Sequence, residues 1–151
     1  MIEDKIAFIS NFFWKKSVEN INSILSIDQT NSFNMNDYYY LTVISQLKTP
    51  NLGDIAKELR LTRPAISAMA RRLIKNGLVE KVQSLQDKRI FHIMLTEKGI
   101  KIIQGDYTLY TDLANEVEEL LSQDQLAEID GLLTALVTQI VKKQHDNKDQ
   151  I

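Results

Sequence analysis

Apolar residues recur with a helical spacing through most of the chain. In residues 2–27 they fall three or four positions apart, and the same spacing returns over residues 126–140. Asn34 followed three positions later by Asp37 is a capping-box pattern, and it begins a helix that is expected to run to about Leu47. These patterns predict a mostly helical protein.

Two shorter helices are expected in the middle of the chain. The first, over residues 52–59, follows the capping pair Asn51 and Asp54. The second, over residues 63–76, follows the cap residue Thr62 and carries a proline in its first turn, where a missing backbone N–H costs nothing. Two short helices joined by a tight turn indicate a helix-turn-helix.

The spacing of apolar residues then changes from the helical period to alternation. Residues 78–83 and 89–95 alternate between apolar and polar types on either side of a short polar loop, which predicts a β-hairpin. Phe91, Ile93 and Leu95 are expected to face the core. A hairpin directly after a helix-turn-helix indicates a wing.

The C-terminal third of the chain predicts two long helices. Thr96 is expected to cap a helix that runs to about Leu121, and Ser122 caps the last one. The polar tail at 142–151 is expected to fray, and residues 31–34 near the start of the chain are expected to form a loop. The predicted fold class is mostly α with a two-stranded β-wing.

The formal net charge of −2 conceals an uneven distribution. Between Arg60 and Arg89 there are eight basic and two acidic residues, a net charge of +6, which leaves −8 for the remainder. Residues 106–130 hold eight acids and no base. A basic segment between acidic flanks suggests local binding of phosphates, although a solvated charged face would give the same pattern.

Composition excludes several classes of protein. An apolar fraction of 44% suits a globular protein, and no apolar run approaches the roughly 18 residues that a membrane span needs. The chain has no cysteine, so thiol redox sensing and thiolate metal sites are excluded. The acidic N-terminus does not look like an export signal, and a cytoplasmic protein is expected.

The helix at 63–76 has the two faces that a DNA-reading helix needs. Its apolar positions share one side, which is expected to pack on the preceding helix, while the other side carries residues suited to a major groove. We expect base contacts from Arg63, Pro64, Ser67 and Ala68. We expect phosphate contacts from Arg71, Arg72, Lys75, Lys81 and Lys88.

The hairpin loop places an acid and a base two positions apart at its tip. Arg89 is expected to enter the minor groove, where narrow A·T tracts concentrate negative potential. Asp87 would be a poor neighbour for phosphate, so it is expected to orient the Arg89 guanidinium through a charge-assisted hydrogen bond.

From Ile55 the chain contains the run IAKELRLTRPAISAMARRLIKNGLVEKV. This run is followed by a second motif, D-x-R and, after five further residues, L-T-x-x-G. Together the two motifs resemble the winged helix-turn-helix of the MarR family of bacterial transcription regulators. The second motif consists here of Asp87, Arg89, Leu95, Thr96 and Gly99. By this resemblance Arg63, Pro64, Ser67 and Ala68 occupy base-reading positions, and Arg89 occupies the tip of the wing.

The resemblance also implies an organisation for the whole chain. A single domain over 1–151 would contain a winged helix-turn-helix at 34–97, with the recognition helix at 63–76 and the wing at 78–95. The helices at 1–30 and 100–145 would interlock in a homodimer that binds a pseudo-palindrome in double-stranded DNA. The family further implies a repressor relieved by a small aromatic or lipophilic effector.

One residue departs from the family's pattern. The family often has glycine or a small polar residue in the turn between the two helices, whereas this chain has Arg60. If Arg60 adopts a positive φ, the strain costs on the order of 1 kcal/mol.

Clustered aromatic residues leave two interpretations open. Tandem aromatics at 12–14 and 38–40 cannot all face one way along a helix. They either pack in the core or a dimer interface, or line an effector pocket, for which Phe13, Trp14 and Tyr38 are the candidates.

Other functions have less support from the sequence. Two isolated histidines do not make a transition-metal site, and neither a phosphate-binding glycine loop nor a nucleophile–His–acid arrangement is present. We therefore expect no enzyme, no cofactor and no membrane partner. The remaining alternative is a winged-helix adaptor that binds proteins and no longer reads DNA.

Overall fold

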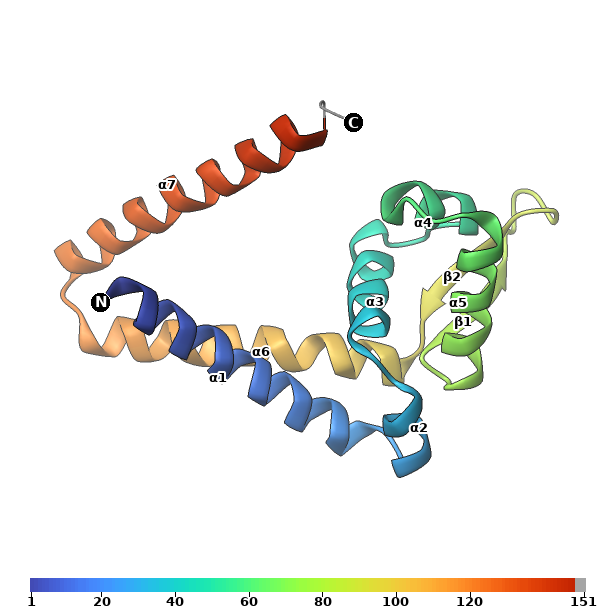
Figure 1. Ribbon diagram of the computed structural model, residues 1–151, viewed down its shortest axis with the longest axis horizontal. Coiled ribbons are helices and arrows are strands. Elements are labelled where there is room, and N and C mark those ends of the chain that lie inside the picture. Colours follow the sequence, from blue (N-terminus) through green and yellow to red (C-terminus); the bar gives the residue numbers. More distant parts are fainter. Residues whose placement is uncertain (149–151) are drawn as a thin grey trace. The chain divides into compact units, whose positions relative to one another are not determined.

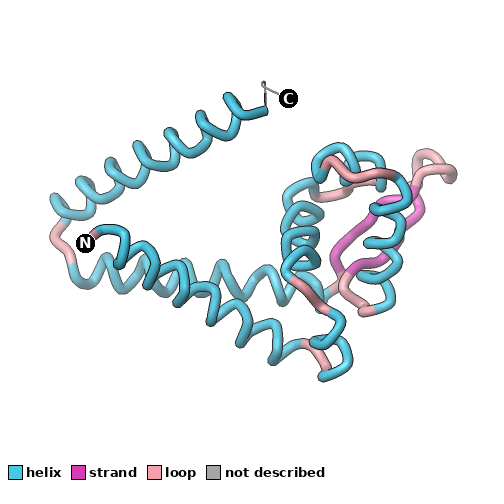
Figure 2. Tube along the Cα trace, in the orientation of Figure 1, coloured by secondary structure: helices cyan, strands magenta, loops and turns pink. Residues whose placement is uncertain are grey.

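The computed structural model describes residues 1–148 and confirms a mostly helical fold with a two-stranded β-wing (Figure 1; Figure 2). The chain divides into two compact units, Met1–Leu109 and the part that begins at Tyr110. The winged helix-turn-helix lies entirely within the first unit.

Side-chain caps set the helix boundaries of the first unit. The Asn34 side chain accepts a hydrogen bond of 3.1 Å from the Asp37 amide, and Asn51 accepts one of 3.0 Å from the Asp54 amide, as the sequence predicts. The helices are α1 (Ile2–Ile24), α2 (Ile27–Ser32), α3 (Met35–Leu47), α4 (Leu52–Leu59), α5 (Arg63–Lys75) and the first part of α6 (Glu97–Leu120).

Helix α2 corrects the prediction of one long N-terminal helix followed by a loop at 31–34. α1 ends because Leu25 is extended, with φ −86° and ψ 145°. Ser26 then begins a new helix: its hydroxyl accepts from the Gln29 amide at 3.4 Å, and its own amide donates to the Gln29 side chain at 3.1 Å.

The core of the first unit lies where α3, α4, α5, the wing and α6 meet. Each of these elements contributes an apolar side chain that is fully buried, so the recognition helix is held by contacts along its whole inner face. The fully buried apolar residues are Leu41, Ile44, Ile55, Ile66, Leu73, Leu78, Val79, Ile93 and Ile102.

The wing is an antiparallel pair of β1 (Val79–Gln83) and β2 (Phe91–Leu95). The strands are shorter than predicted, because the chain stays in the loop until Ile90. β2 is also tied to the chain ahead of α4: the Ile93 amide donates to the Pro50 carbonyl at 2.8 Å, and Asn51 bridges to His92. The wing is therefore fixed to the helix-turn-helix on the side away from its tip.

The Leu95–Gly99 motif joins the wing to α6. The Thr96 hydroxyl donates to the Gly77 carbonyl at 2.6 Å and accepts from the Gly99 amide at 3.2 Å, which confirms Thr96 as a helix cap. A Cβ atom on Gly99 would collide with the backbone carbonyl of Leu78. The motif thus requires glycine because the first turn of α6 lies directly against the chain that enters the wing.

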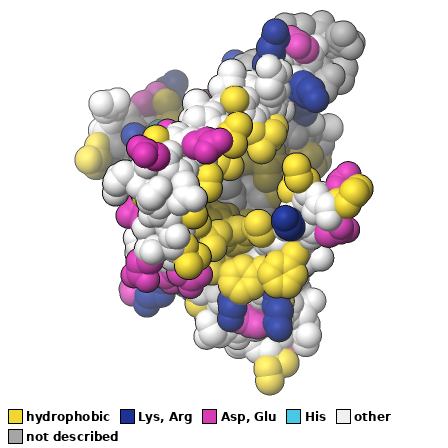
Figure 3. All heavy atoms as spheres, turned by 90° about the vertical axis from the view of Figure 1, so that its left-hand side faces the viewer, with side chains coloured by type: hydrophobic (Ala, Val, Ile, Leu, Met, Phe, Trp, Pro, Cys, Tyr) yellow, Lys and Arg dark blue, Asp and Glu magenta, His cyan; other side chains and the backbone are white. Residues whose placement is uncertain are grey.

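The second unit consists of the rest of α6 and α7 (Gln123–Lys148). α7 is helical as far as Lys148, so the helix extends past residue 142, where the polar tail begins. The fraying expected of that tail stays a prediction, and its last three residues lie outside the described ones. Many apolar side chains of the protein lie open on the surface (Figure 3). On α7 the exposed ones are Ile129, Leu132, Leu133, Leu136, Val137, Ile140 and Val141.

In the part of the chain that the structure describes, no helix is long and apolar enough to cross a membrane.

Candidate nucleic-acid interface

The recognition helix α5 has one buried and one exposed face. Thr62 caps it by accepting from the Ala65 amide at 3.4 Å, and a proline occupies its first turn. Its inner face packs into the core through Ile66, Met69, Ala70 and Leu73, as predicted. Of the residues expected on the other face, Arg63, Pro64, Ala68, Arg71 and Lys75 are exposed and Ser67 is half-buried.

The turn between α4 and α5 holds Arg60 in the left-handed region, with φ 52° and ψ 40°. The turn is closed by the Leu61 amide, which donates to the Ala56 carbonyl at 3.0 Å. A residue with a Cβ pays a steric cost in this conformation. The departure noted in the sequence is therefore a real site of backbone strain, and it leaves the Arg60 side chain exposed beside the recognition helix.

Arg72 has a different place from the one expected. Its guanidinium forms an ion pair with Asp37 of α3, and its Nε donates to Asp37 Oδ1 at 3.1 Å. The Asp37 side chain is fully buried. Because the charge of Arg72 is paired with this carboxylate, Arg72 ties α5 to α3, and we no longer expect it to contact a phosphate.

The tip of the wing is ordered by its own backbone. The Asp87 carboxylate accepts from the Arg89 backbone amide at 2.9 Å, and the Ile90 amide donates to the Asp87 carbonyl at 2.9 Å. No ion pair joins the side chains of Asp87 and Arg89 among the described residues. Asp87 therefore shapes the loop that presents Arg89, and the expected contact with the guanidinium is wrong. Lys88 and Arg89 are both exposed.

Lys81 and Arg89 both line a shallow groove of about 320 Å³ between the wing and the start of α4. The Lys81 ammonium lies 4.1 Å from the centre of the Phe91 ring. Phe91 is on the same face of β2 as Ile93, as the alternation predicts, but it is only half-buried and lies outside the core, where its ring faces the Lys81 cation. Ile93 is buried and Leu95 packs against the core as expected. The groove brings two cations toward the N-terminus of α4, an arrangement that suits a phosphate.

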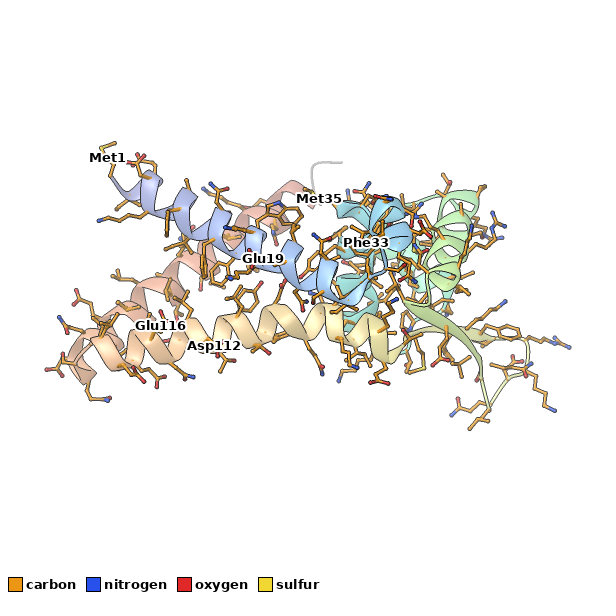
Figure 4. All side chains as sticks on the ribbon, turned by 90° about the horizontal axis from the view of Figure 1, so that it is seen from below. Met1, Glu19, Phe33, Met35, Asp112 and Glu116 are labelled. Atoms are coloured by element: carbon orange, nitrogen blue, oxygen red, sulfur yellow. The ribbon has the colours of Figure 1, made fainter. Side chains whose placement is uncertain are left out.

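A second hollow lies between α1 and the segment joining α2 to α3. It is an apolar cavity of about 220 Å³, and Trp14 and Tyr38 line it. Phe13 is not among the lining residues and contacts Phe12 edge-on, with ring centres 6.0 Å apart. Sequence reasoning missed Phe33 and Met35, which are labelled in Figure 4 beside α1. The full lining is Trp14, Val18, Ile21, Asn22, Thr30, Phe33, Asn34, Met35 and Tyr38.

A buried polar cluster adjoins this cavity. Asp106 of α6 accepts from the Tyr38 hydroxyl and, at 2.6 Å, from the Ser17 hydroxyl of α1. Asp106 and Ser17 are both buried. The cluster fixes the rotamer of one cavity-lining aromatic and ties α1 and α3 to α6. Sequence reasoning missed it because the three residues lie far apart along the chain.

Comparisons with known proteins agree with this architecture. Residues 33–91 match the model of the MarR family. The chain is 24% identical over 92 residues to the HTH-type transcriptional regulator BilQ of Clostridioides difficile, a match that covers 61% of this chain and 62% of BilQ, slightly under two thirds of it.

Two solved structures share the fold over most of the chain. Streptococcus pneumoniae FabT in complex with DNA has a TM-score of 0.63 and 22% identity, over 93% of this chain and 96% of FabT. S. aureus MepR bound to ethidium bromide has a TM-score of 0.68 and 21% identity, over the same shares of the two chains. The family match and the wing motif identify residues 33–91, which hold most of the winged helix-turn-helix, as a MarR-family region, and the two solved structures share the fold over most of the chain.

Proposed function

We propose that the protein is a dimeric, sequence-specific DNA-binding transcriptional regulator that represses transcription from a pseudo-palindromic operator. The observation that carries this proposal is the division of α5 into a face locked in the core and a face that presents Arg63, Pro64 and Ala68 to solvent. A helix held in this way fits a major groove without rearrangement. That FabT was solved in complex with DNA supports the same function here.

Each residue of the reading surface has a chemical role in this proposal. Arg63 is suited to bidentate pairing with guanine O6 and N7, and Pro64 and Ala68 offer small apolar surfaces to a thymine methyl. Arg71, Lys75 and Lys88 would contact phosphates, and Lys81 would do so from the groove beside the wing. Arg89, at the wing tip, would enter the minor groove.

Binding to the region upstream of the protein's own gene tests the proposal. Fluorescence anisotropy should show a complex that prefers this DNA to a scrambled duplex and weakens steeply with salt. Arg63→Ala should flatten the preference at one base pair per half-site, whereas Lys101→Ala, an exposed lysine on α6, should change nothing. An Arg63→Ala variant that loses affinity equally on every sequence would make Arg63 a phosphate contact.

The proposal of a homodimer rests on an apolar surface of α7 that the rest of the second unit leaves exposed. Leu132, Leu133, Leu136 and Val137 of α7 are 53–65% exposed. Four neighbouring apolar side chains left open on one helix mark an interface, and a second copy of the chain is the occupant that would pair two recognition helices on a palindrome. Light scattering should give twice the chain mass, and Leu133→Glu should shift the protein to monomer and abolish operator binding; a monomeric wild type would overturn the dimer.

The effector would occupy the cavity lined by Trp14 and Tyr38. Its lining is apolar, without a charged side chain, so it suits an uncharged aromatic or lipophilic molecule. The MepR structure with ethidium bromide supports binding of an aromatic compound in this family. Trp14 is the only tryptophan in the sequence, so its fluorescence reports on the cavity directly. A neutral nitroaromatic such as 4-nitroanisole should quench it saturably, and linear collisional quenching alone would count against the site.

A further inference from the structure

We propose that Asp37 couples the cavity to the recognition helix, so that the occupancy of the cavity sets the position of α5 through the chain of contacts Asn34–Asp37–Arg72. This inference rests on the proposed function and adds to it the route by which an effector acts. Asp37 becomes a positioning residue for DNA binding, although it touches neither DNA nor effector.

The two oxygens of the Asp37 carboxylate face two different elements. Oδ2 accepts from the Asn34 backbone amide at 3.1 Å, and the Asn34 side chain in turn accepts from the Asp37 amide. Oδ1 accepts from the guanidinium of Arg72. Asn34 lines the cavity and Arg72 belongs to α5, so one buried carboxylate joins the cavity wall to the recognition helix.

The chain contains an internal comparison that separates this role from helix capping. Asn51 and Asp54 form the same capping box at the start of α4, with matching hydrogen bonds of 2.9 and 3.0 Å. Asp54 is exposed, and among the described residues it forms no ion pair. Capping therefore requires neither the burial of Asp37 nor its arginine partner. A buried charge is costly unless it is paired, so the pair with Arg72 calls for another explanation than capping.

A second tie links the same wall to the same end of α5. Gln29 of α2 donates to the Asn76 carbonyl at 2.9 Å, and the Asn76 side chain donates to the Ser32 hydroxyl at 3.3 Å. Thr30, between them, lines the cavity. The last turn of α5 is thus held at two points by segments that form the cavity wall, while the base-reading residues lie at the opposite end of the helix.

This geometry converts a local displacement into a change at the DNA surface. A ligand that pushes Asn34 away from α1 strains the hydrogen bonds of Asp37. Asp37 then moves together with its partner Arg72, so the C-terminal end of α5 is displaced. The ligand acts only if it binds the displaced arrangement more tightly than the DNA-binding one. Coupling of this kind is reciprocal, so operator DNA should also weaken the binding of a ligand in the cavity.

A double-mutant cycle tests the route without an identified effector. Val18→Phe adds a ring to the cavity wall from α1 and stands in for a bound ligand, and Asp37→Asn keeps the shape of the side chain but removes its charge. The dissociation constant for operator DNA is measured for both variants and their combination. Asp54→Asn, in the matched capping box, is the control background.

In the wild-type and Asp54→Asn backgrounds, Val18→Phe should weaken binding by about fivefold or more, which is the lower end of typical coupling between sites. In the Asp37→Asn background its effect should fall below about twofold. An undiminished effect of Val18→Phe in that background would overturn the proposed route, and no effect in the wild type would overturn the coupling itself.

Hydrogen exchange of the free protein provides a readout that does not depend on DNA. Val18→Phe should speed amide exchange in the last turn of α5, and should no longer do so once Asp37 is replaced; unchanged exchange in the wild-type background would contradict the proposal. If the wild type binds no DNA, the proposed function fails and this exchange experiment alone decides the coupling. Should Asp37→Asn fail to fold, Arg72→Lys takes its place, because it keeps the charge but loses the Nε contact.

Discussion

Replacing Arg60 with glycine should stabilise the protein. Arg60 lies at φ 52° and ψ 40°, where a residue with a Cβ pays about 1–2 kcal/mol. Glycine removes that strain but loses more chain entropy on folding, at a cost of roughly 0.5–1 kcal/mol. Among the described residues no hydrogen bond or ion pair of the Arg60 guanidinium is lost. The free energy of unfolding should therefore rise by about 0.5–1 kcal/mol.

Thermal and urea unfolding measure this change. For a chain of this size the midpoint temperature should rise by about 1–4 °C, with an unchanged urea m-value. Two controls separate backbone strain from loss of the side chain. Arg60→Ala removes the guanidinium but keeps the Cβ, so it should not stabilise. Lys57→Gly, at an exposed position inside α4, should destabilise by about 1 kcal/mol. An Arg60→Gly variant no more stable than Arg60→Ala would refute the strain argument.

Three further substitutions test the wing and its junction. Gly99→Ala forces a Cβ against the Leu78 carbonyl, so the midpoint of thermal unfolding should fall further than it does for a surface substitution. An unchanged midpoint would mean that the junction yields easily. Arg89→Ala should weaken operator binding by about 1–3 kcal/mol and lower the salt slope by about one, and an unchanged affinity would place the wing outside the groove. Asp87→Ala removes the acceptor for the Arg89 amide. Hydrogen exchange of the amides at the loop tip should therefore become faster, by a factor equivalent to roughly 0.5–1.5 kcal/mol, while the amides of the two strands keep their protection.

Local signals in the sequence predicted the helix-turn-helix and the wing well. The caps at Asn34, Asn51 and Thr62 lie where the structure has them, and the apolar positions of α5 are the buried ones. These features depend on neighbours within one or two turns of helix, so a single sequence contains the information. The short helix α2 escaped prediction because its six residues hold no full apolar period, although the Ser26–Gln29 capping pair was there to be read.

Long-range contacts could not be predicted in the same way. Arg72 lies at the edge between the buried and exposed faces of α5, and its partner Asp37 is 35 positions away. Nothing in the helical period distinguishes a guanidinium that reaches a phosphate from one that reaches a buried carboxylate. Phe13 and Trp14 are neighbours in the sequence, yet a rotation of about 100° per residue leaves only Trp14 in the cavity. Such choices are made by packing between distant segments.

A hydroxyl-radical footprint on the operator tests the central claim most directly, because it shows where a dimer of winged helices contacts each strand. The proposed function predicts two protected patches related by a two-fold axis, with their centres about one helical turn, roughly 34 Å, apart. Each patch should carry an outer minor-groove protection that Arg89→Ala removes. A single unsymmetrical patch, or uniform cleavage at a protein concentration that shifts the DNA completely, would contradict the claim that two copies of α5 and the wing read the operator.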